Sequence, residues 1–107
     1  MAEPTLIEVF GAGATQTATA ITILKADLPG LTASPTNTAE SLLAGIMLQA
    51  GTALTPTARD ANPDQSIAIE QGFDQVAYRG TTAYYQSART VTLQKINTSA
   101  TIDPDDY

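Results

Sequence analysis

The side chains of this 107-residue chain that could do chemistry are carboxylates and hydroxyls, because the sequence has no His and no Cys. Their absence removes the commonest general base, the commonest metal ligand, thiolate nucleophiles and disulfides. A Ser nucleophile would then need Lys as its base, and Lys25 and Lys95 stand in no S-x-x-K spacing. We therefore expect no enzyme.

Paired carboxylates are the remaining catalytic possibility. A glycosidase holds two acids roughly 5 to 9 Å apart across a sugar-sized cleft, whereas the acids here are scattered along the whole chain. The enzymatic alternative is a small carboxylate hydrolase that uses Asp60, Asp64 or Glu70.

Three acids gather near the end of the chain, at Asp103, Asp105 and Asp106. Their oxygens could bind a hard cation, but the glycine and the later Glu of an EF-hand loop are missing. We predict that residues 97–107 form an extended acidic C-terminal tail, with no metal and no cofactor.

The turn Gly11-Ala12-Gly13-Ala14 follows a β-type run and so invites a dinucleotide-binding interpretation. The third glycine of G-x-G-x-x-G would fall on Gln16, and the residues after it are β-branched rather than helical. The pattern predicts a hairpin turn and not a phosphate site.

Composition and charge restrict the kinds of partner that we expect for this chain. The net charge is -6 with only five basic residues, whereas binding to a phosphate backbone needs clustered Lys and Arg, so we expect no nucleic acid partner. The longest apolar stretch, Leu42–Leu48, is far short of the roughly 20 residues that span a bilayer. Residues 1–4 do not resemble a signal peptide, so we expect a soluble chain made in the cytoplasm and not secreted by a signal peptide.

The first half of the chain combines two predicted strands with one helix. Thr5–Phe10 is apolar on both sides and predicts a strand, and Thr15–Leu24 is rich in β-branched residues and predicts its partner. Asp27-Leu28-Pro29-Gly30 predicts a turn that uses a positive φ at Gly30. Leu31–Thr36 is an irregular connector.

The helix is predicted over residues 38–50, where apolar residues follow the i, i+3, i+4, i+7 rule. Asn37 and Glu40 suggest a capping box, and Gly51 stands where a helix-ending glycine belongs. The helix is apolar nearly all round, so it needs cover on two sides. We predict that Gly45 and Leu48 contact a neighbouring subunit.

The second half predicts a loop and then a long hairpin. Thr52–Asp64 lacks periodicity and predicts a loop. Ser66–Tyr78 and Ala83–Ile96 alternate as two strands joined by a turn at Arg79–Thr82. Apolar residues change parity near Gly72, which indicates a β-bulge. The fold class is therefore α+β, mainly β, a single domain of antiparallel hairpins with about four strands, one short apolar helix and extended termini.

Charge along the hairpin suggests an interface. No acid lies between Gln75 and Ile102, and this span holds three basic residues and several tyrosines. We predict that this basic strip pairs with the acidic tail of a neighbouring copy; the alternative is a tail that folds back or stays in solvent. The candidate interface residues are Gly45, Leu48, Arg79, Tyr84, Arg89, Lys95, Asp103, Asp105, Asp106 and Tyr107.

The run GAGATQTATAITILKADLPGLTASPTNTAESLLAGIM, with the closing DPDDY and the Thr- and Ala-rich composition, resembles small virion structural proteins of tailed bacteriophages, of the cyanophage type. The resemblance implies a non-enzymatic virion protein, first a capsid cement or decoration protein that bridges neighbouring subunits. It would be located in the virion, in a symmetric homo-oligomeric assembly with other virion proteins. The alternatives are a tail, baseplate, neck or fibre component, and a host-encoded peptide- or glycan-binding module.

Overall fold

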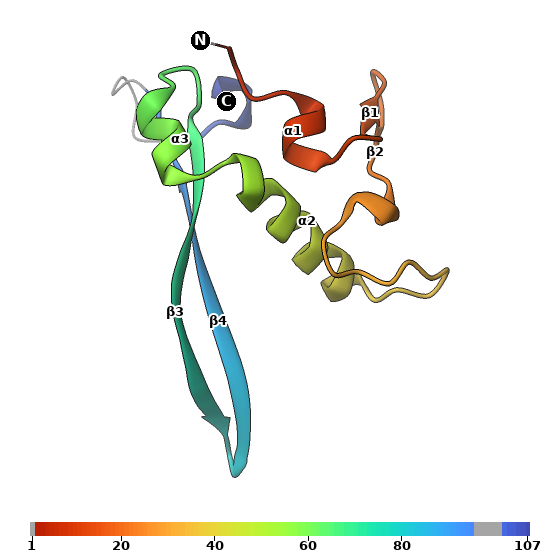
Figure 1. The fold of residues 1–107 in the computed structure, drawn as a ribbon, viewed down its shortest axis with the longest axis vertical. Coiled ribbons are helices and arrows are strands. Elements are labelled where there is room, and N and C mark those ends of the chain that lie inside the picture. Colours follow the sequence, from red (N-terminus) through yellow and green to blue (C-terminus); the bar gives the residue numbers. More distant parts are fainter. Residues whose placement is uncertain (1, 96–101) are drawn as a thin grey trace.

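The structure, a computed structural model, describes residues 2–95 and 102–107 (Figure 1). Within these residues the α-helices are α1 (Leu6–Phe10), α2 (Ala39–Ala53) and α3 (Pro56–Ala61). The strands are β1 (Thr15–Gln16), β2 (Ile21–Thr22), β3 (Ile67–Arg79) and β4 (Thr82–Leu93). Two 3-10 turns, η1 (Lys25–Asp27) and η2 (Pro104–Asp106), complete the described elements. The predicted α+β class with antiparallel hairpins is confirmed, although helical and strand residues are of comparable number.

The first predicted strand is wrong, because Leu6–Phe10 is helix α1. The Thr5 side chain accepts a hydrogen bond from the Glu8 backbone N–H at 3.2 Å and donates one to the Glu8 carboxylate at 2.9 Å. This T-x-x-E pattern is a helix-start signal that outweighs the β-branched residues of a short segment. The turn at Gly11 therefore leads from a helix into β1 and is not a hairpin turn.

The second predicted strand is a small hairpin of β1 and β2, paired with each other and not with Leu6–Phe10. Asp27 holds the glycine-rich turn beside it, since its carboxylate accepts a hydrogen bond from the Gly13 backbone N–H at 2.7 Å. The glycines thus serve packing rather than phosphate binding. The predicted turn at Pro29 is confirmed, with φ +74° at Gly30 and a hydrogen bond from Leu31 N–H to the Leu28 carbonyl.

The predicted helix is confirmed as α2, but it begins and ends at other residues than expected. Its N-cap is Thr38, whose side chain accepts a hydrogen bond from Ser41 N–H at 3.1 Å. Asn37 instead closes the preceding loop, accepting from Ser34 N–H. Gly51 lies inside the helix, which continues to Ala53.

The predicted loop over Thr52–Asp64 is wrong in its middle, where Pro56–Ala61 forms helix α3. Thr55 caps this helix by accepting from Ala58 N–H, and Pro56 occupies its first turn, a position that suits the fixed φ of proline. Buried Gln65 joins the end of the helical region to the hairpin, because its Nε2 donates to the carbonyls of Thr55 and Ile67.

The long hairpin of β3 and β4 is confirmed. Its register changes between Gln71 and Asp74, so two residues, Gly72 and Phe73, lie opposite Ala88, which is the predicted bulge. The two-residue loop Gly80-Thr81 has φ +62° at Gly80, and no non-glycine residue in the described part of the chain has a positive φ. These angles fit a II′ turn, which preserves the twist of the strands.

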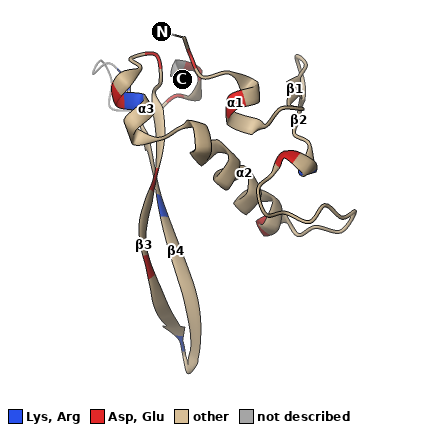
Figure 2. Cartoon of the chain, in the orientation of Figure 1, with Lys and Arg blue, Asp and Glu red and all other residues tan. Residues whose placement is uncertain are grey.

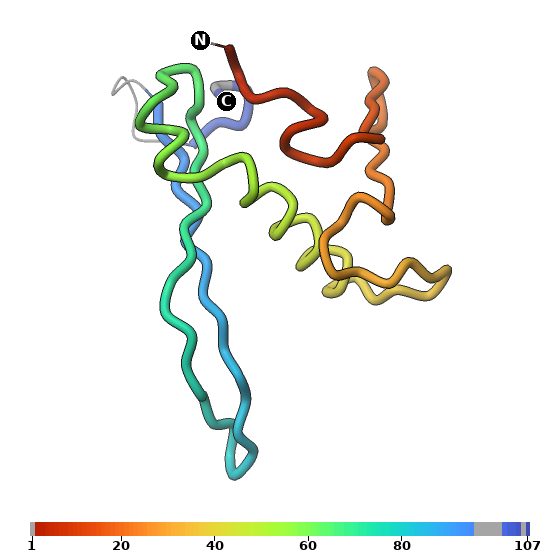
Figure 3. The backbone as a smooth tube through the Cα atoms, viewed as in Figure 1, coloured from red at the N-terminus to blue at the C-terminus, as the bar shows by residue number. Residues whose placement is uncertain are grey.

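The packed core is small and lies at one end of this hairpin. Ala50, Leu54 and Ile69 form it, with Val9 and Ile67 packed against them. The radius of gyration is 16.1 Å, whereas about 13 Å is typical of a compact domain of this length. Figure 3 shows the reason: the β3–β4 hairpin projects far from the helices as an arm.

Candidate assembly interface

The arm has two faces, which the strand register defines. Residues opposite each other across β3 and β4 point to the same side of a sheet. The side that meets α2, called the front face, carries the pairs Ile67–Leu93, Ile69–Val91, Gln71–Arg89, Asp74–Ser87, Val76–Tyr85 and Tyr78–Ala83. The opposite side, called the back face, carries the pairs Ala68–Thr92, Glu70–Thr90, Gln75–Gln86, Ala77–Tyr84 and Arg79–Thr82.

Helices cover only the root of the arm, the end farthest from the turn. On the front face, Ile69 packs against Ala50 and Leu54 near the end of α2 and donates its N–H to the Leu54 carbonyl at 2.7 Å. On the back face, Ala68 is 1% exposed, and Arg59 of α3 donates to Thr92 Oγ1 at 2.9 Å. The root is therefore clamped between α2 and α3.

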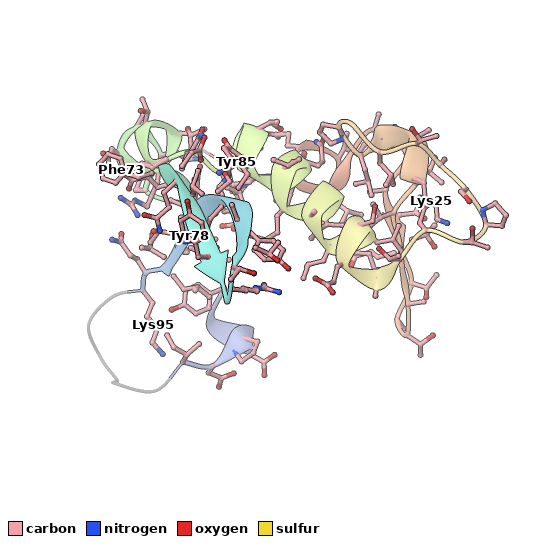
Figure 4. All side chains as sticks on the ribbon, turned by 90° about the horizontal axis from the view of Figure 1, so that it is seen from below. Lys25, Phe73, Tyr78, Tyr85 and Lys95 are labelled. Atoms are coloured by element: carbon pink, nitrogen blue, oxygen red, sulfur yellow. The ribbon has the colours of Figure 1, made fainter. Side chains whose placement is uncertain are left out.

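The rest of the arm exposes large apolar side chains. Phe73 in the bulge is 91% exposed, and the front-face residues Val76, Tyr78 and Tyr85 are 60%, 71% and 74% exposed. Figure 4 shows Phe73 on the side of the arm away from α2. Apolar side chains that are exposed together in a large patch mark interaction sites on soluble proteins. Because tyrosine buries a ring and keeps a polar tip, it suits a protein interface.

A polar belt crosses the middle of the front face. Tyr85 Oη donates to Asp74 Oδ2 at 2.5 Å. This bond, helped by a bond from Ser87 and by the charge of Arg89, lowers the pKa of Asp74 below its usual value, and the same bond raises the pKa of Tyr85. The Arg89 guanidinium donates to Ser87 Oγ at 2.6 Å. The belt therefore holds an ionised carboxylate and a guanidinium on one exposed surface.

The predicted basic strip is only partly present. The antiparallel pairing of β3 with β4 brings Glu70 and Asp74 alongside Arg89, as the adjacent red and blue segments in Figure 2 show. Arg79, near the turn, stacks over the Tyr84 ring at 4.7 Å. Charges of both signs therefore share the arm, and only its outer end remains basic.

Two leucines of α2 are exposed, and one of them, Leu48, lines a cavity between that helix and the arm. Leu43 and Leu48 are 59% and 43% exposed. Shallow cavities of about 200 Å³ flank Leu48: one is lined by Ile69, Gln71 and Arg89 of the arm, and the other lies against the Pro29–Leu31 turn. Leu48 is thus exposed, and its contact with a neighbouring subunit stays a prediction.

Gly45 is not accessible in this way. It is buried against Leu28, and a Cβ at this position would lie 3.1 Å from the Leu28 Cβ. Its small size lets the chain's own Leu28 approach the helix, so the expected contact between Gly45 and a neighbouring subunit is replaced by an internal one.

The C-terminal candidates lie in η2, next to it, or just after β4. Ile96 and the tail residues 97–101 fall outside the described residues. In η2, the Asp103 side chain accepts from Asp105 N–H at 3.0 Å, and both carboxylates are exposed. Tyr107 is half-buried, and its hydroxyl is buried without a hydrogen-bond partner. Asp106 belongs to η2, and Lys95 follows β4 as a half-buried residue that makes a polar contact.

The acids considered for catalysis lie on separate elements. Asp60 on α3 pairs with Arg59 at 3.6 Å, Asp64 lies in the loop after that helix, and Glu70 is exposed on the back face. Among the described residues, no three potential metal-binding acids come together. No helix in the described ranges is long and apolar enough to cross a membrane.

Sequence reasoning identified the arm but did not select Phe73, the most exposed of its large apolar side chains. The available signal was the bulge itself, since an extra residue in one strand redirects its neighbours.

The comparisons with protein-family models, curated proteins and solved structures found no match for this chain.

Proposed function

We propose that this chain is a non-enzymatic structural subunit of a bacteriophage particle, and first a capsid cement protein that bridges neighbouring shell subunits. The observation that carries the proposal is a surplus of exposed surface. The chain exposes 7785 Å², whereas a compact monomer of 11.2 kDa exposes about 5,700 Å². A chain with so much open surface gains stability when other chains cover it.

The placement of the apolar surface supports a bridging role. Tyr78 and Tyr85 are exposed on the outer half of the arm, beyond the bulge, whereas Leu43 and Leu48 are exposed on α2, which packs on the arm only at its root. A cement protein has to hold two neighbours at once, and two separate apolar surfaces meet that requirement. The resemblance of the first half of the chain to phage virion proteins favours the same function.

The test is the composition of purified particles from cells that produce the chain. We expect mass spectrometry to find the chain at a copy number proportional to that of the shell subunit, and antibody labelling to place it on the head. Label on the tail, baseplate, neck or fibres would reassign it to that part. A stable monomer that is absent from particles would refute the proposal.

Shells that lack the chain provide the functional measurement. Added purified chain should bind them and raise the temperature at which they break open. A Leu48→Asp variant should bind more weakly, because it places a charge on the open side of α2. The matched control is Thr57→Asp, which adds the same charge at an exposed position of α3.

A further inference from the structure

The two strands of the arm are both edge strands, because in the described part of the chain their sheet contains only β3 and β4. The β3 edge is protected in two ways. The bulge at Gly72 and Phe73 interrupts it, and at the root the Ile69 N–H donates to the Leu54 carbonyl at 2.7 Å. Bulges and covering contacts keep a sheet edge from pairing with another chain.

The β4 edge is built differently. Strand β4 runs from Thr82 to Leu93 without a proline or a bulge, and every residue except Ala88 is exposed. A long, exposed and regular edge strand is a template on which another strand can form hydrogen bonds. We therefore expect an added strand at β4 and not at β3.

The register identifies the backbone groups that face this edge. The Gln94 N–H donates to the Ser66 carbonyl at 2.8 Å, so the even-numbered residues of β4 turn their N–H and C=O groups toward β3. The odd-numbered residues turn theirs away. The bond from Ile69 to Leu54 agrees with this alternation, because Ile69 is opposite Val91 and its N–H also points out of the pair.

The outer half of the β4 edge can pair with an identical strand. The bulge adds residues to β3 only, so the alternation along β4 continues to the turn. The residues beyond the bulge whose backbone groups point away from β3 are Ala83, Tyr85 and Ser87. An antiparallel copy centred on Tyr85 places Tyr85 opposite itself and Ala83 opposite Ser87 of the other copy. Each of these pairs exchanges two N–H···O bonds.

The side chains of this stretch suit pairing with a second copy. Like charges directly opposite each other destabilise a sheet, and residues 80–88 contain no charged side chain. Arg89 comes level with Thr81 in the turn of the other copy, so it faces no cation there. Tyr85 meets Tyr85 on the front face, and Tyr84 lies opposite Gln86 on the back face. Aromatic pairs of this kind add to the stability of a sheet.

The second arm avoids the helices. Because the pairing is centred on Tyr85, the turn of the second arm extends only to the level of Arg89. Helix α2 packs on the arm nearer the root, at Ile69, and α3 bonds to it at Thr92. Figure 1 shows the outer half of the arm clear of both helices. The added strand continues the sheet sideways, and the two-fold axis places the helices of the second copy beyond the turn of the first arm.

A second copy also supplies what the outer arm lacks. A two-stranded hairpin is marginally stable in water, whereas three or more strands with an apolar face are stable. The chain exposes about 2,100 Å² more than a compact monomer, and a standard interface buries about 800 Å² on each partner. Pairing at β4 therefore leaves Phe73, on the β3 edge, open to other proteins.

We propose that two copies of this chain pair edge to edge through the outer halves of their β4 strands, in one continuous antiparallel sheet with a two-fold axis at Tyr85. This dimer deepens the proposed function and rests on it, since it names the first partner of the virion subunit as a second copy.

A disulfide tests the register, because the chain has no Cys of its own. In the dimer the two copies of residue 85 have Cα atoms about 5.5 Å apart, a separation that a disulfide spans. Tyr85→Cys should therefore give a covalent dimer on mild oxidation, seen on a gel without reductant. The matched control is Val76→Cys, opposite Tyr85 on the same face but on the β3 edge, which should form no such link. No link from Tyr85→Cys, or equal linkage of both variants, would overturn the proposal.

Proline tests the backbone pairing. Sedimentation should show a dimer for the unmodified chain. Ala83→Pro removes an N–H that points away from β3, which a single hairpin tolerates, but the dimer loses that bond in each copy. We expect dimerisation to weaken by at least about 10-fold. Val76→Pro removes an outward N–H from the β3 edge and should leave the dimer intact. Circular dichroism checks that both variants fold, and equal effects of the two on dimerisation would contradict pairing at β4.

The dimer and the particle role fail in different ways. An unmodified chain that is monomeric in solution but present in particles would overturn the dimer alone. A dimer that responds to the Ala83 and Tyr85 variants but is absent from particles would overturn the virion role alone.

Discussion

The two ends of the β3–β4 arm are built from the same kind of alternating sequence, yet they have opposite environments. At the root, Ala68 and Ile69 are 1% and 9% exposed. Beyond the bulge, Tyr78 and Tyr85 are 71% and 74% exposed. The helices α2 and α3 account for the difference, because they clamp only the root.

The apolar side chains of the two halves therefore differ in what they contribute to the stability of the monomer. Those of the root are packed in the core of the chain, whereas those beyond the bulge stay exposed and contribute little to the stability of the monomer. A two-stranded hairpin is marginally stable by itself, so the outer half of the arm gains most from a partner.

The largest expected effect comes from truncating one apolar side chain in each half. Ile69→Ala should lower the free energy of unfolding by about 2–4 kcal/mol, because it leaves a cavity in a small core. Phe73→Ala, at a side chain 91% exposed, should change it by less than about 0.5 kcal/mol. Urea denaturation at low protein concentration measures both, and similar values would abolish the distinction between root and outer arm.

A smaller effect is expected when the same comparison of root and outer arm is made with one glutamine from each region. Gln65→Ala removes the donor to the Thr55 and Ile67 carbonyls, and unpaired buried carbonyls cost about 1–3 kcal/mol. Gln86→Ala, at an exposed position of the arm beyond the bulge, is the control and should stay within about 0.5 kcal/mol. Equal stability of the two variants would show that the Gln65 bonds do not hold the root in place.

Two glycines of α2 test how closely this helix packs against the rest of the chain. Gly51→Ala should stabilise by up to about 1 kcal/mol, because alanine favours helix and the new Cβ would lie 3.7 Å from Ile69 Cγ2. Gly45→Ala gains the same helix propensity but places a Cβ 3.1 Å from buried Leu28, which offsets or reverses the gain. Thermal unfolding compares them, and equal gains would mean that Leu28 yields easily.

The smallest effect concerns the polar belt between the two halves. Because the pKa of Asp74 is lowered in the folded chain, its ionised form stabilises the arm at pH values above 3.8, the usual pKa of this carboxyl. This contribution is lost as the pH falls below that value through the folded pKa. In an NMR titration, Tyr85→Phe should raise the Asp74 pKa toward 3.8, since the Tyr85 bond is the main cause of the shift. Tyr84→Phe on the back face should leave it unchanged.

Local signals carried most of the prediction for the arm. Alternation with period two, the parity change near Gly72 and the Gly80 turn are properties of neighbouring residues, so the hairpin and its bulge could be predicted. Two helix starts were equally local signals: the T-x-x-E pattern that begins at Thr5, and the Thr55-Pro56 pair that begins α3. The first was obscured by the β-branched residues around it, and the second by the irregular composition of its segment.

The candidate site depended on contacts between distant segments. Leu48 could be selected because its helix is apolar on several sides, but Gly45 could not be assigned to Leu28 without knowing how the Pro29 turn packs on α2. The basic strip was predicted from β4 alone, and the acids that accompany it come from β3.

The sequence by itself excluded two kinds of chemistry: with no His and no Cys, the chain has no imidazole and no thiolate, whatever the fold. It also determined the arm, since strand alternation and turn geometry are set by residues close in the chain. Only the tertiary structure decided which half of the arm is covered, because burial depends on where α2 and α3 pack. It likewise decided that Asp74 and Arg89 share one face, because the bulge and the strand register set that face together.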